Sequence, residues 1–345
     1  MLEKLAQQLA AMRPLTDEQI HQSVELLIDE NIPAGIKADF LAALAKKGET
    51  PGEIAAFARA LRDKSVPPPF DAETRAREIL DVVGTGGDRH GTFNISTTAA
   101  IVCAAAGVMV AKHGNRAVTS QAGSADVLEA LGVRIDLTPA EAVRSLREHH
   151  FAFFFAPNYH PAFQHIGSAR KLCARRGQRT IFNFLGPLLN PARPSAMLVG
   201  VPQPELCEPL ALVLQTLGVR RAMVVCGAVS AASHLDELST LGTSTIAEFY
   251  QERGFATSTL SPEQFPLQPA TLADLIGGDC RANAEIVRRI LQGDERGPKR
   301  DAVLLNTAAA LFVAGKAKSL AAGWDLAGET IDSGRAKAKL AELAR

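Results

Sequence analysis

Residues Ile79–Gly132 read ILDVVGTGGDRHGTFNISTTAAIVCAAAGVMVAKHGNRAVTSQAGSADVLEALG, and this stretch decides the fold. The apolar run Ile79–Val83 predicts a buried strand of a parallel sheet. It ends in Gly84-Thr85-Gly86-Gly87-Asp88, where three glycines allow the backbone to turn sharply and approach a ligand closely. Exposed N–H groups in such a turn form a concavity that binds anions.

A second junction follows about ten residues later. The capping residues of Asn94–Thr98 precede the small-residue run Ala99–Ala106, which predicts the N-terminus of a helix, another anion-binding feature. A strand over Val108–Val110 then leads to the cationic loop that begins at Lys112. Together these features favour a polyphosphate site over plain tight turns. The common motifs do not account for it, because Arg89 replaces the last glycine of G-x-G-x-x-G and no G-K-[ST] follows.

The first 65 residues predict a helical unit. Thr16 and Gln19 form a capping box, Pro33 and Gly48 bound a second helix, and Thr50 starts a third. These helices carry no chemistry of their own, so their apolar faces serve an internal core or a subunit contact. The run 67–69 of three prolines predicts a stiff connector to the next domain.

From Ile79 onward, strands and helices alternate. Strands are predicted over 151–155, 196–201 and 221–225, and helices over 139–149, 161–176, 205–217, 283–291, 302–317 and 331–345. Such alternation implies right-handed βαβ units and a mostly parallel sheet. We therefore expect an α/β fold with a small N-terminal helical domain, residues 1–70, and a larger α/β domain, residues 75–345. A helical segment at about 160–178 would pack with the N-terminal helical domain.

The adjacent carboxylates Asp236 and Glu237 form a second chemical cluster. Alone, an Asp-Glu pair is usually a solvated surface turn. This pair, however, follows the strand Ala222–Val225, so it can reach the carboxyl edge of the sheet, where ligands bind. There it would offer the oxygen ligands that Mg²⁺ prefers.

Composition excludes several classes of function. The formal net charge is +0, which argues against a nucleic-acid or anionic-membrane partner. The five cysteines lie without CxxC or histidine spacing, which suits a reducing compartment and no zinc site. The N-terminal stretch has no apolar signal core, and no run is long enough to cross a bilayer. We therefore expect a cytoplasmic location.

Seven motifs together resemble the anthranilate phosphoribosyltransferase family, in the family's order. They are GTGGD (84–88), NIST (94–97), KHGNRAVTS (112–120), GSADVLEALG (123–132), HPAF (160–163), RTIFNFLGPLLNP (179–191) and LDELSTLG (235–242). The resemblance implies transfer of the phosphoribosyl group of 5-phosphoribosyl 1-pyrophosphate (PRPP) to the amine of anthranilate, in tryptophan biosynthesis. It also implies Mg²⁺, two ions per chain, and a homodimer formed through the helical domain.

The resemblance assigns residues to three groups. For PRPP it implies Gly84, Gly87, Asp88, Thr92, Asn94, Ile95, Ser96, Thr97, Lys112, His113, Gly114, Asn115, Arg116, Ser120 and Ser124. For anthranilate it implies Gly84, His113, Asn115, His160, Arg170, Gly186 and Pro187, with Arg170 binding the carboxylate. For metal it implies Ser96, Asp236 and Glu237. A neutral arylamine needs no strong base, so no certain catalytic residue is expected; Lys112, Asp88 and the metals would stabilise the transition state.

Two segments depart from the family pattern. Residues 171–179 make a link about three residues longer than usual, which could extend the helix by roughly one turn and shift Arg170, leaving Arg175 or Arg176 as substitutes. Residues 228–234 are also longer than usual and lack the usual glycine before LDE.

Two alternatives remain open at the level of sequence. A pyrimidine nucleoside phosphorylase shares KHGNR and GSAD, but it needs no paired carboxylates for Mg²⁺. A non-catalytic, nucleic-acid-binding relative would need a basic patch, for example around Lys171, Arg175, Arg176 and Arg179.

Overall fold

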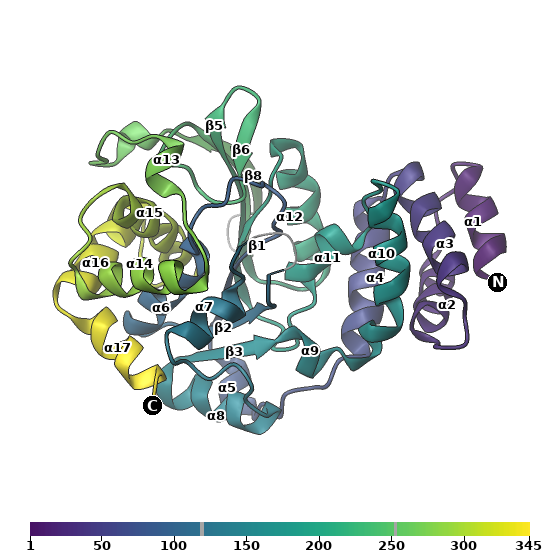
Figure 1. Ribbon diagram of the computed structural model, residues 1–345, viewed down its shortest axis with the longest axis horizontal. Helices are drawn as coiled ribbons and strands as arrows, with labels where there is room; N and C mark the ends of the chain where they lie inside the picture. The colour runs from purple at the N-terminus through teal and green to yellow at the C-terminus, as the bar shows by residue number, and fades with distance from the viewer. Residues whose placement is uncertain (118–120, 252–253) are drawn as a thin grey trace.

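A mainly parallel sheet forms the centre of the computed structural model, which describes residues 1–117, 121–251 and 254–345 (Figure 1). Within the described residues its order is β3-β2-β1-β4-β5-β7-β8, and β6 pairs with β5. The parallel strands are β1 (Ile79–Gly84), β2 (Met109–Gly114), β3 (Phe151–Phe155), β4 (Ala196–Gly200) and β5 (Arg221–Ser230). They are buried on both faces, which is why their sequences are almost continuously apolar.

Three antiparallel strands complete the sheet, two of them extending one edge, and the sequence analysis missed all three. They are β6 (Ser233–Leu235), β7 (Ser244–Tyr250) and β8 (Gly254–Leu260). Strand β8 is an exposed edge built from small polar residues, so it lacks the apolar period that identifies a strand. Strand β5 also continues to Ser230, beyond the predicted end at Val225, because it pairs with β7 on one side and β6 on the other.

The helical unit lies at one end of the molecule (Figure 1). It contains α1 (Leu2–Ala10), α2 (Asp17–Ile28), α3 (Ala34–Lys47) and α4 (Pro51–Asp63), and α10 (Gln164–Arg175) packs against α2 and α3. The predicted capping box at Thr16 and the predicted helix start at Thr50 are confirmed, and Thr50 also forms a capping box with Glu53. The helical unit and the mainly parallel sheet confirm the predicted fold class. The exact division at residues 70 and 75 stays a prediction.

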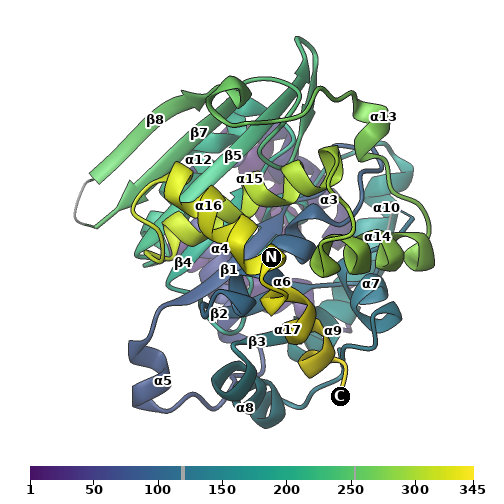
Figure 2. The ribbon, with the colours of Figure 1, turned by 90° about the vertical axis from the view of Figure 1, so that its left-hand side faces the viewer.

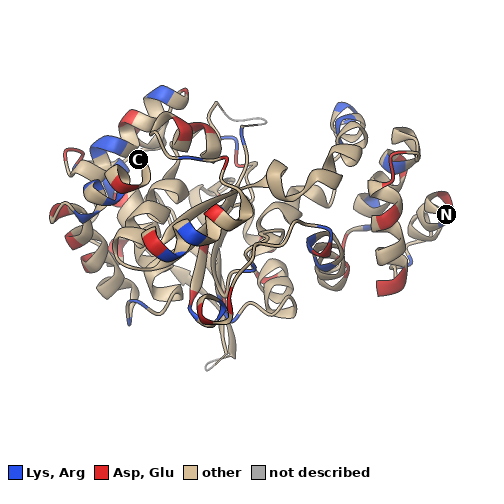
Figure 3. Ribbon diagram, turned by 90° about the horizontal axis from the view of Figure 1, so that it is seen from below, with Lys and Arg blue, Asp and Glu red and all other residues tan. Residues whose placement is uncertain are grey.

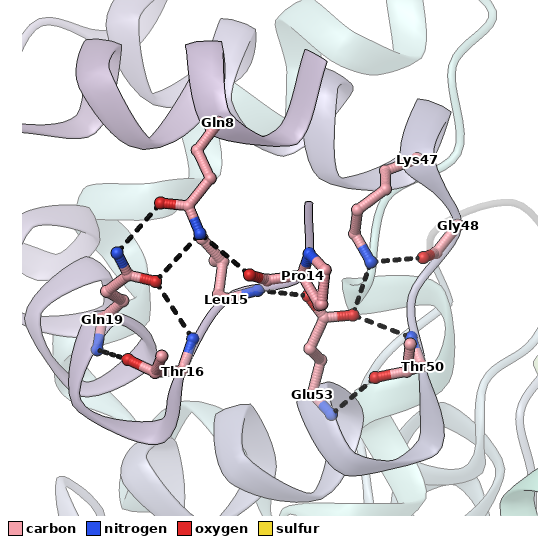
Figure 4. Close-up of polar contacts among 9 residues, drawn as sticks. All are labelled: Gln8, Pro14, Leu15, Thr16, Gln19, Lys47, Gly48, Thr50 and Glu53. Carbon is pink, nitrogen blue, oxygen red and sulfur yellow. Dashed lines mark hydrogen bonds and ion pairs between the residues drawn. The ribbon is translucent and has the colours of Figure 1, made fainter. Parts of the chain in front are cut away.

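Glu53 fastens the loops of the helical unit together (Figure 4). Its carboxylate accepts hydrogen bonds from the backbone N–H groups of Leu15 (3.0 Å) and Thr50 (2.9 Å), and from Lys47 Nζ at 2.6 Å. Burial alone would raise the pKa of Glu53, but these hydrogen bonds bring it below its usual value. A buried, fully bonded carboxylate therefore fixes the start of α4 relative to the chain before α2.

Helices cover both faces of the sheet. One face carries α6 (Ile95–Ala105), α7 (Ser124–Ala130), α14 (Cys280–Gln292), α15 (Pro298–Val313), α16 (Leu320–Asp332) and α17 (Arg335–Leu343), part of which Figure 2 shows on its near side. The other face carries α8 (Pro139–His149), α11 (Phe182–Leu188) and α12 (Cys207–Thr216). Three short helices complete the chain: α5 (Ala72–Ala76), α9 (Ala156–Tyr159) and α13 (Leu272–Leu275).

The helix predicted over 331–345 is confirmed in part, because α17 lies within this range but begins only at Arg335. Helix α16, which the sequence analysis missed, ends at Asp332, and Gly334 takes a left-handed conformation (φ +79°) before α17 begins. The predicted helix over 302–317 likewise runs from Pro298 to Val313, followed by the left-handed Gly315. Five of the 13 residues of α16 are alanine or glycine, so its apolar period is weak in the sequence.

One apolar core connects the two units. It runs from Leu41 and Phe57 of the helical unit through Ile166 and Leu214 to Val224 in the sheet. Two chain segments cross beside each other, since Val66 N–H donates to the Tyr159 carbonyl at 2.9 Å. These contacts connect the sheet with α10 and α11.

The surface mixes charges of both signs. Figure 3 shows basic and acidic segments interspersed over the helices of both units. Within the described ranges, no helix is long and apolar enough to span a lipid bilayer. The cytoplasmic location stays a prediction.

Two glycines of α16 test the close packing of α15 on α16. A Cβ at Gly323 would lie 2.5 Å from the Ala308 carbonyl oxygen, whereas a Cβ at Gly328 would meet its nearest atom, of Arg300, at 4.0 Å. We expect Gly323→Ala to lower the free energy of unfolding by about 1–3 kcal/mol. Gly328→Ala should raise it by up to about 1 kcal/mol. Urea unfolding measures both, and a Gly323→Ala protein as stable as the wild type would contradict the packing.

Candidate functional site

Three neighbouring strands carry glycines where residues 236–237 cross their carboxyl ends. A Cβ at Gly84 or Gly200 would fall under 3.0 Å from atoms of Asp236, and one at Gly227 would lie 2.5 Å from the Glu237 carbonyl. In β1, β4 and β5 respectively, only glycine lets the chain pass this closely. The carboxylates therefore lie at the carboxyl edge of the sheet, as their position after β5 predicts, and are not a solvated turn.

Acidic groups are crowded at this edge. Asp236 Oδ2 accepts the Gly86 N–H at 2.7 Å, and Glu237 Oε1 accepts the Ser96 N–H at 3.2 Å. Burial, then the charges of Asp88 and Glu237, raise the pKa of Asp236 well above its usual value. Burial also raises the pKa of Glu237 to about 7, against the opposing charge of Lys112. Of these acids, Glu237 is the one whose charge acts on Lys112, together with that of Asp81 in β1.

The two carboxylates occupy N–H groups that the sequence analysis reserved for an anionic ligand. The Gly86 N–H belongs to the glycine turn, and the Ser96 N–H belongs to the first turn of α6. In the structure both donate to acidic side chains, because those side chains lie directly beneath them. The turn itself has the predicted shape, with Gly86, Gly87 and Arg89 at positive φ.

These residues fit a divalent cation. Asp88 Oδ2 is buried and has no hydrogen-bond partner among the described residues. A cation between the carboxylates would relieve their repulsion and pair that oxygen. Within the part of the chain that the structure describes, no group of three His, Cys, Asp or Glu side chains is arranged to hold a metal by itself. Ser96, Asp236 and Glu237 would therefore leave coordination positions for ligand oxygens or water, as Mg²⁺ commonly requires.

Asn94 does not cap α6, contrary to the prediction. Its side chain makes no capping hydrogen bond. Instead its Oδ1 accepts from Asn283 Nδ2 at 3.0 Å, and Asn283 Oδ1 accepts from the Gly278 N–H at 2.8 Å. This leaves Asn94 Nδ2 directed toward the Ala122 carbonyl at 3.4 Å, beside the loop before α7. A residue far along the chain thus takes the acceptor that a cap would use.

A buried network of hydrogen bonds surrounds Lys112. Lys112 Nζ donates to the Val82 carbonyl at 2.6 Å. Asn190 Nδ2 donates both to Asp81 Oδ2 and to the Ala111 carbonyl, each at 2.8 Å. Burial raises the pKa of Asp81 to about 6 even though Lys112 and Asn190 oppose the change. Asp81 and Asn190 were not among the predicted site residues; Asn190 lies in a quoted motif, but its role has no signal in the sequence.

The loop after β2 brings several other predicted residues to the same edge. A Cβ at Gly114 would collide with Ser124 Oγ, and the Asn115 carbonyl accepts from the Ala125 N–H at 3.3 Å, so β2 and α7 are in contact. The Arg116 guanidinium is engaged by Glu129 at 2.8 Å and by Asp126 at 3.0 Å. It would bind a phosphate only after leaving these partners.

Four further predicted residues are placed as follows. Thr92 pairs with Ile276 in an isolated β-bridge, which anchors the end of the glycine loop. The side chains of Ile95 and Thr97 are buried within α6, so they have only backbone groups to offer a ligand. Ser120 lies outside the described residues.

A row of aromatic rings extends from the sheet edge to Phe182, the first residue of α11. The ring centroids of His113 and His160 are 5.4 Å apart, those of His160 and Phe163 are 4.8 Å apart, and those of Phe163 and Phe182 are 5.9 Å apart. The Arg170 guanidinium lies over Phe182, with Cζ 5.1 Å from the centroid. The sequence analysis missed the two phenylalanines, and motif position is the only signal that could have identified them. The row thus ends at α11, which also contains Gly186 and Pro187.

The two histidines are buried and neutral. Burial, with the neighbouring His160 as a second cause, lowers the pKa of His113 to about 3. Burial lowers the pKa of His160 to about 4. His113 Nε2 and both ring nitrogens of His160 have no hydrogen-bond partner among the described residues. This side of the site therefore presents uncharged rings with unused polar atoms.

The longer segment after Arg170 is partly helical, because α10 continues into it as far as Arg175. Helix α10 ends at Arg175, and Gly177 (φ +68°) closes it with the Gln178 N–H donating to the Cys173 carbonyl at 3.0 Å. Arg176, one of the two substitutes for Arg170, instead pairs with Asp39 of α3 at 2.8 Å.

The longer segment before the carboxylates forms the hairpin of β5 and β6. Ala228 pairs with His234 in this hairpin. At its end, Ser233 Oγ lies 3.1 Å from His90 Nε2, so the hairpin contacts the glycine loop. The extra residues therefore support the loop that carries Gly86 and Asp88.

Comparisons with known proteins cover nearly the whole chain. A family model described as the glycosyl transferase family, a/b domain, matches residues 76–337, and one described as the helical bundle domain matches residues 1–65. The anthranilate phosphoribosyltransferase of Lacticaseibacillus paracasei is 45% identical over 343 residues, which are 99% of this chain and 96% of the relative. The crystal structure of that enzyme from Thermus thermophilus is similar with a TM-score of 0.88 and 41% identity, covering 99% and 98% of the two chains. The Saccharomyces cerevisiae enzyme in complex with PRPP and Mg is similar with a TM-score of 0.87 and 28% identity, covering 99% and 96%.

The neutral histidine pair predicts how stability depends on pH. Both folded pKa values lie below the usual value of about 6.5, so in mild acid the unfolded chain binds protons that the folded chain does not. The free energy of unfolding should therefore fall as the pH drops from about 7 to 5, by up to about 1.4 kcal/mol per pH unit for each histidine. Urea unfolding of His113→Asn should show a shallower slope than the wild type.

The exposed His21 provides the control for this measurement. His21→Gln should leave the slope unchanged, because that side chain is 64% exposed. A His113→Asn slope equal to that of the wild type would show that the ring does not resist protonation in the folded chain.

Proposed function

The chain belongs to the anthranilate phosphoribosyltransferase family, and on that premise we propose that it transfers the phosphoribosyl group of PRPP to the amine of anthranilate, releasing pyrophosphate. One observation carries the proposal: Asp236 and Glu237 meet the glycine turn and the first turn of α6 at one sheet edge. The uncharged row that begins at His113 starts at that same edge. A site for a polyanion with its metal thus adjoins a site for a flat aromatic ring.

The donor side would use this chain's acidic and backbone groups. Ser96, Asp236 and Glu237 would hold two Mg²⁺ ions, a number that rests on the resemblance. Bound Mg²⁺ would neutralise the charge that develops on the departing pyrophosphate. The left-handed Gly87 and the side chains of Asp88 and Asn94 would orient the ribose phosphate, while buried Lys112 balances the acids beneath it.

The acceptor side would position a neutral nucleophile and exclude water. An arylamine is uncharged near neutral pH, so attack at the ribose carbon needs no strong base. His113 and His160, both neutral, would contact the ring without placing a charge beside it. Arg170 would bind the carboxylate, and Gly186 and Pro187 would form an apolar wall.

Neither alternative has a specific observation in its favour. A pyrimidine nucleoside phosphorylase would not need the paired carboxylates that three strand glycines accommodate. A nucleic-acid-binding relative would need a basic groove, yet Arg176, in the suggested patch, is neutralised by Asp39. A homodimer formed through the helical unit remains part of the proposal, supported by the resemblance alone.

A fluorescence assay tests the activity directly. Purified protein with PRPP, Mg²⁺ and anthranilate should remove anthranilate fluorescence, and omission of any one component should abolish the loss. Binding of PRPP without any loss of fluorescence would reject anthranilate as the acceptor.

Variants of the carboxylate pair provide the control for metal. Asp236→Asn and Glu237→Gln each remove a charge of the pair, so Mg²⁺-dependent turnover should fall at least about 100-fold. If both variants keep wild-type turnover and metal dependence, the metal assignment is wrong.

Arg170 and Arg176 separate specific carboxylate binding from general surface charge. Arg170→Gln should raise the KM for anthranilate about 10- to 100-fold, because a charge-assisted hydrogen bond contributes about 1.5–3 kcal/mol. The KM for PRPP should stay within about twofold. Arg176→Gln, which breaks only the pair with Asp39, should change neither KM. An Arg170→Gln enzyme with an unchanged KM for anthranilate would exclude Arg170 from acceptor binding.

A further inference from the structure

We propose that Asn306, on α15, is a positioning residue that holds Asp236 and Glu237 in place for metal binding. The inference rests on the proposed function, in which those two residues bind Mg²⁺. Asn306 belongs to none of the motifs that define the site, and it lies about 70 residues from the carboxylates in the chain. Its side chain hydrogen-bonds to Leu238 and Ala302, which are assigned to neither substrate, so it acts through the backbone that carries the carboxylates.

The Asn306 side chain binds both backbone polar groups of Leu238, the residue directly after Glu237. Its Oδ1 accepts the Leu238 N–H at 2.9 Å, and its Nδ2 donates to the Leu238 carbonyl at 3.0 Å. A further bond from Nδ2 to the Ala302 carbonyl, at 2.9 Å, fixes the side chain against its own helix. Asn306 is fully buried, so no solvent competes for these bonds.

A carboxamide suits this position because it offers a donor and an acceptor in one plane. It pairs with Leu238 as an adjacent strand would. An aspartate would keep the bond to the N–H but would repel the carbonyl. A leucine would fill a similar volume yet leave two buried backbone groups without partners, which buried backbone rarely tolerates.

Residues 236–239 are held by contacts with β5 on one side and with α15 on the other. On the side of β5, Gly227 makes room for Glu237, and Ser239 Oγ donates to the Ala228 carbonyl at 2.7 Å. On the other side, α15 supplies Asn306. Helix α15 also packs against α6, whose first turn donates the Ser96 N–H to Glu237. Helix α15 therefore positions both the backbone next to Glu237 and the Ser96 N–H group to which Glu237 is hydrogen-bonded.

Thr307 provides a matched control on the same helix. It is fully buried like Asn306, but its hydroxyl has no hydrogen-bond partner among the described residues. Asn306→Leu and Thr307→Val each replace a buried polar side chain by an apolar one of similar size, and only the first removes contacts with Leu238.

The experiment titrates the whole protein with cation at saturating PRPP. Two readouts are used: Mn²⁺ binding by electron paramagnetic resonance, and the Mg²⁺ concentration that gives half-maximal turnover of anthranilate. Asn306→Leu should raise both cation midpoints about tenfold while the KM for anthranilate stays within about twofold. Thr307→Val should match the wild type in every value. High Mg²⁺ should restore most of the turnover of Asn306→Leu.

Each other outcome has a definite reading. Wild-type cation midpoints in Asn306→Leu overturn the inference, as does an equal rise in the KM for anthranilate, which would indicate general distortion. If the wild type binds Mn²⁺ with PRPP but consumes no anthranilate, the proposed function fails, and the Mn²⁺ titration still decides the role of Asn306. If Asn306→Leu does not fold, Asn306→Asp replaces it, and an unchanged Mn²⁺ midpoint there overturns the inference.

Discussion

The repulsion among Asp88, Asp236 and Glu237 is the constraint on which the rest of the site depends. These acids gather at the carboxyl edge of the sheet, where Lys112 is the cationic neighbour of Glu237. Loss of solvent around the carboxyl groups and the nearby negative charges raise the pKa values of Asp236 and Glu237. Such an arrangement is costly in the folded chain alone. It is understandable in a protein that binds a divalent cation, because the cation turns repulsion into attraction. The cost is then offset when substrate and metal arrive together.

The sheet makes this crowding possible. Gly84, Gly200 and Gly227 leave room for the backbone of residues 236–237, so the carboxylates lie over the strand ends instead of beyond them. From there they reach the N–H groups of Gly86 and Ser96. The carboxylates thus accept hydrogen bonds from two N–H groups that could otherwise bind a phosphate directly. A phosphate would meet this edge through metal and the remaining backbone groups, which makes its binding dependent on cation.

The acceptor side, in contrast to the crowded carboxylates, is nearly uncharged. Its histidines lose charge on burial, and its rings continue to α11, where Arg170 lies over Phe182. A highly charged half and a nearly uncharged half therefore meet at His113, which directly follows Lys112 in β2. The continuous apolar core between the helical unit and the sheet holds the two halves in register. A charged reactant and an aromatic reactant can then each bind in the half of the site that matches its polarity before the reaction begins.

Local patterns in the sequence determined strand β1 and the glycine turn that follows it, the capping box at Thr16, and the place of Asp236 after a strand. Each depends on neighbours within a few residues, which is why it could be predicted. The predicted cationic loop from Lys112 is in part strand, because β2 continues to Gly114. Tertiary structure alone decided which distant groups meet: Asp88 with Asp236, Asn283 with Asn94, and Asn306 with Leu238. It also decided that Asn94 is no cap and that the segment 228–234 is a hairpin. The physical reason is competition, because a donor or acceptor binds the best partner that packing brings near it, and packing joins segments far apart in the chain.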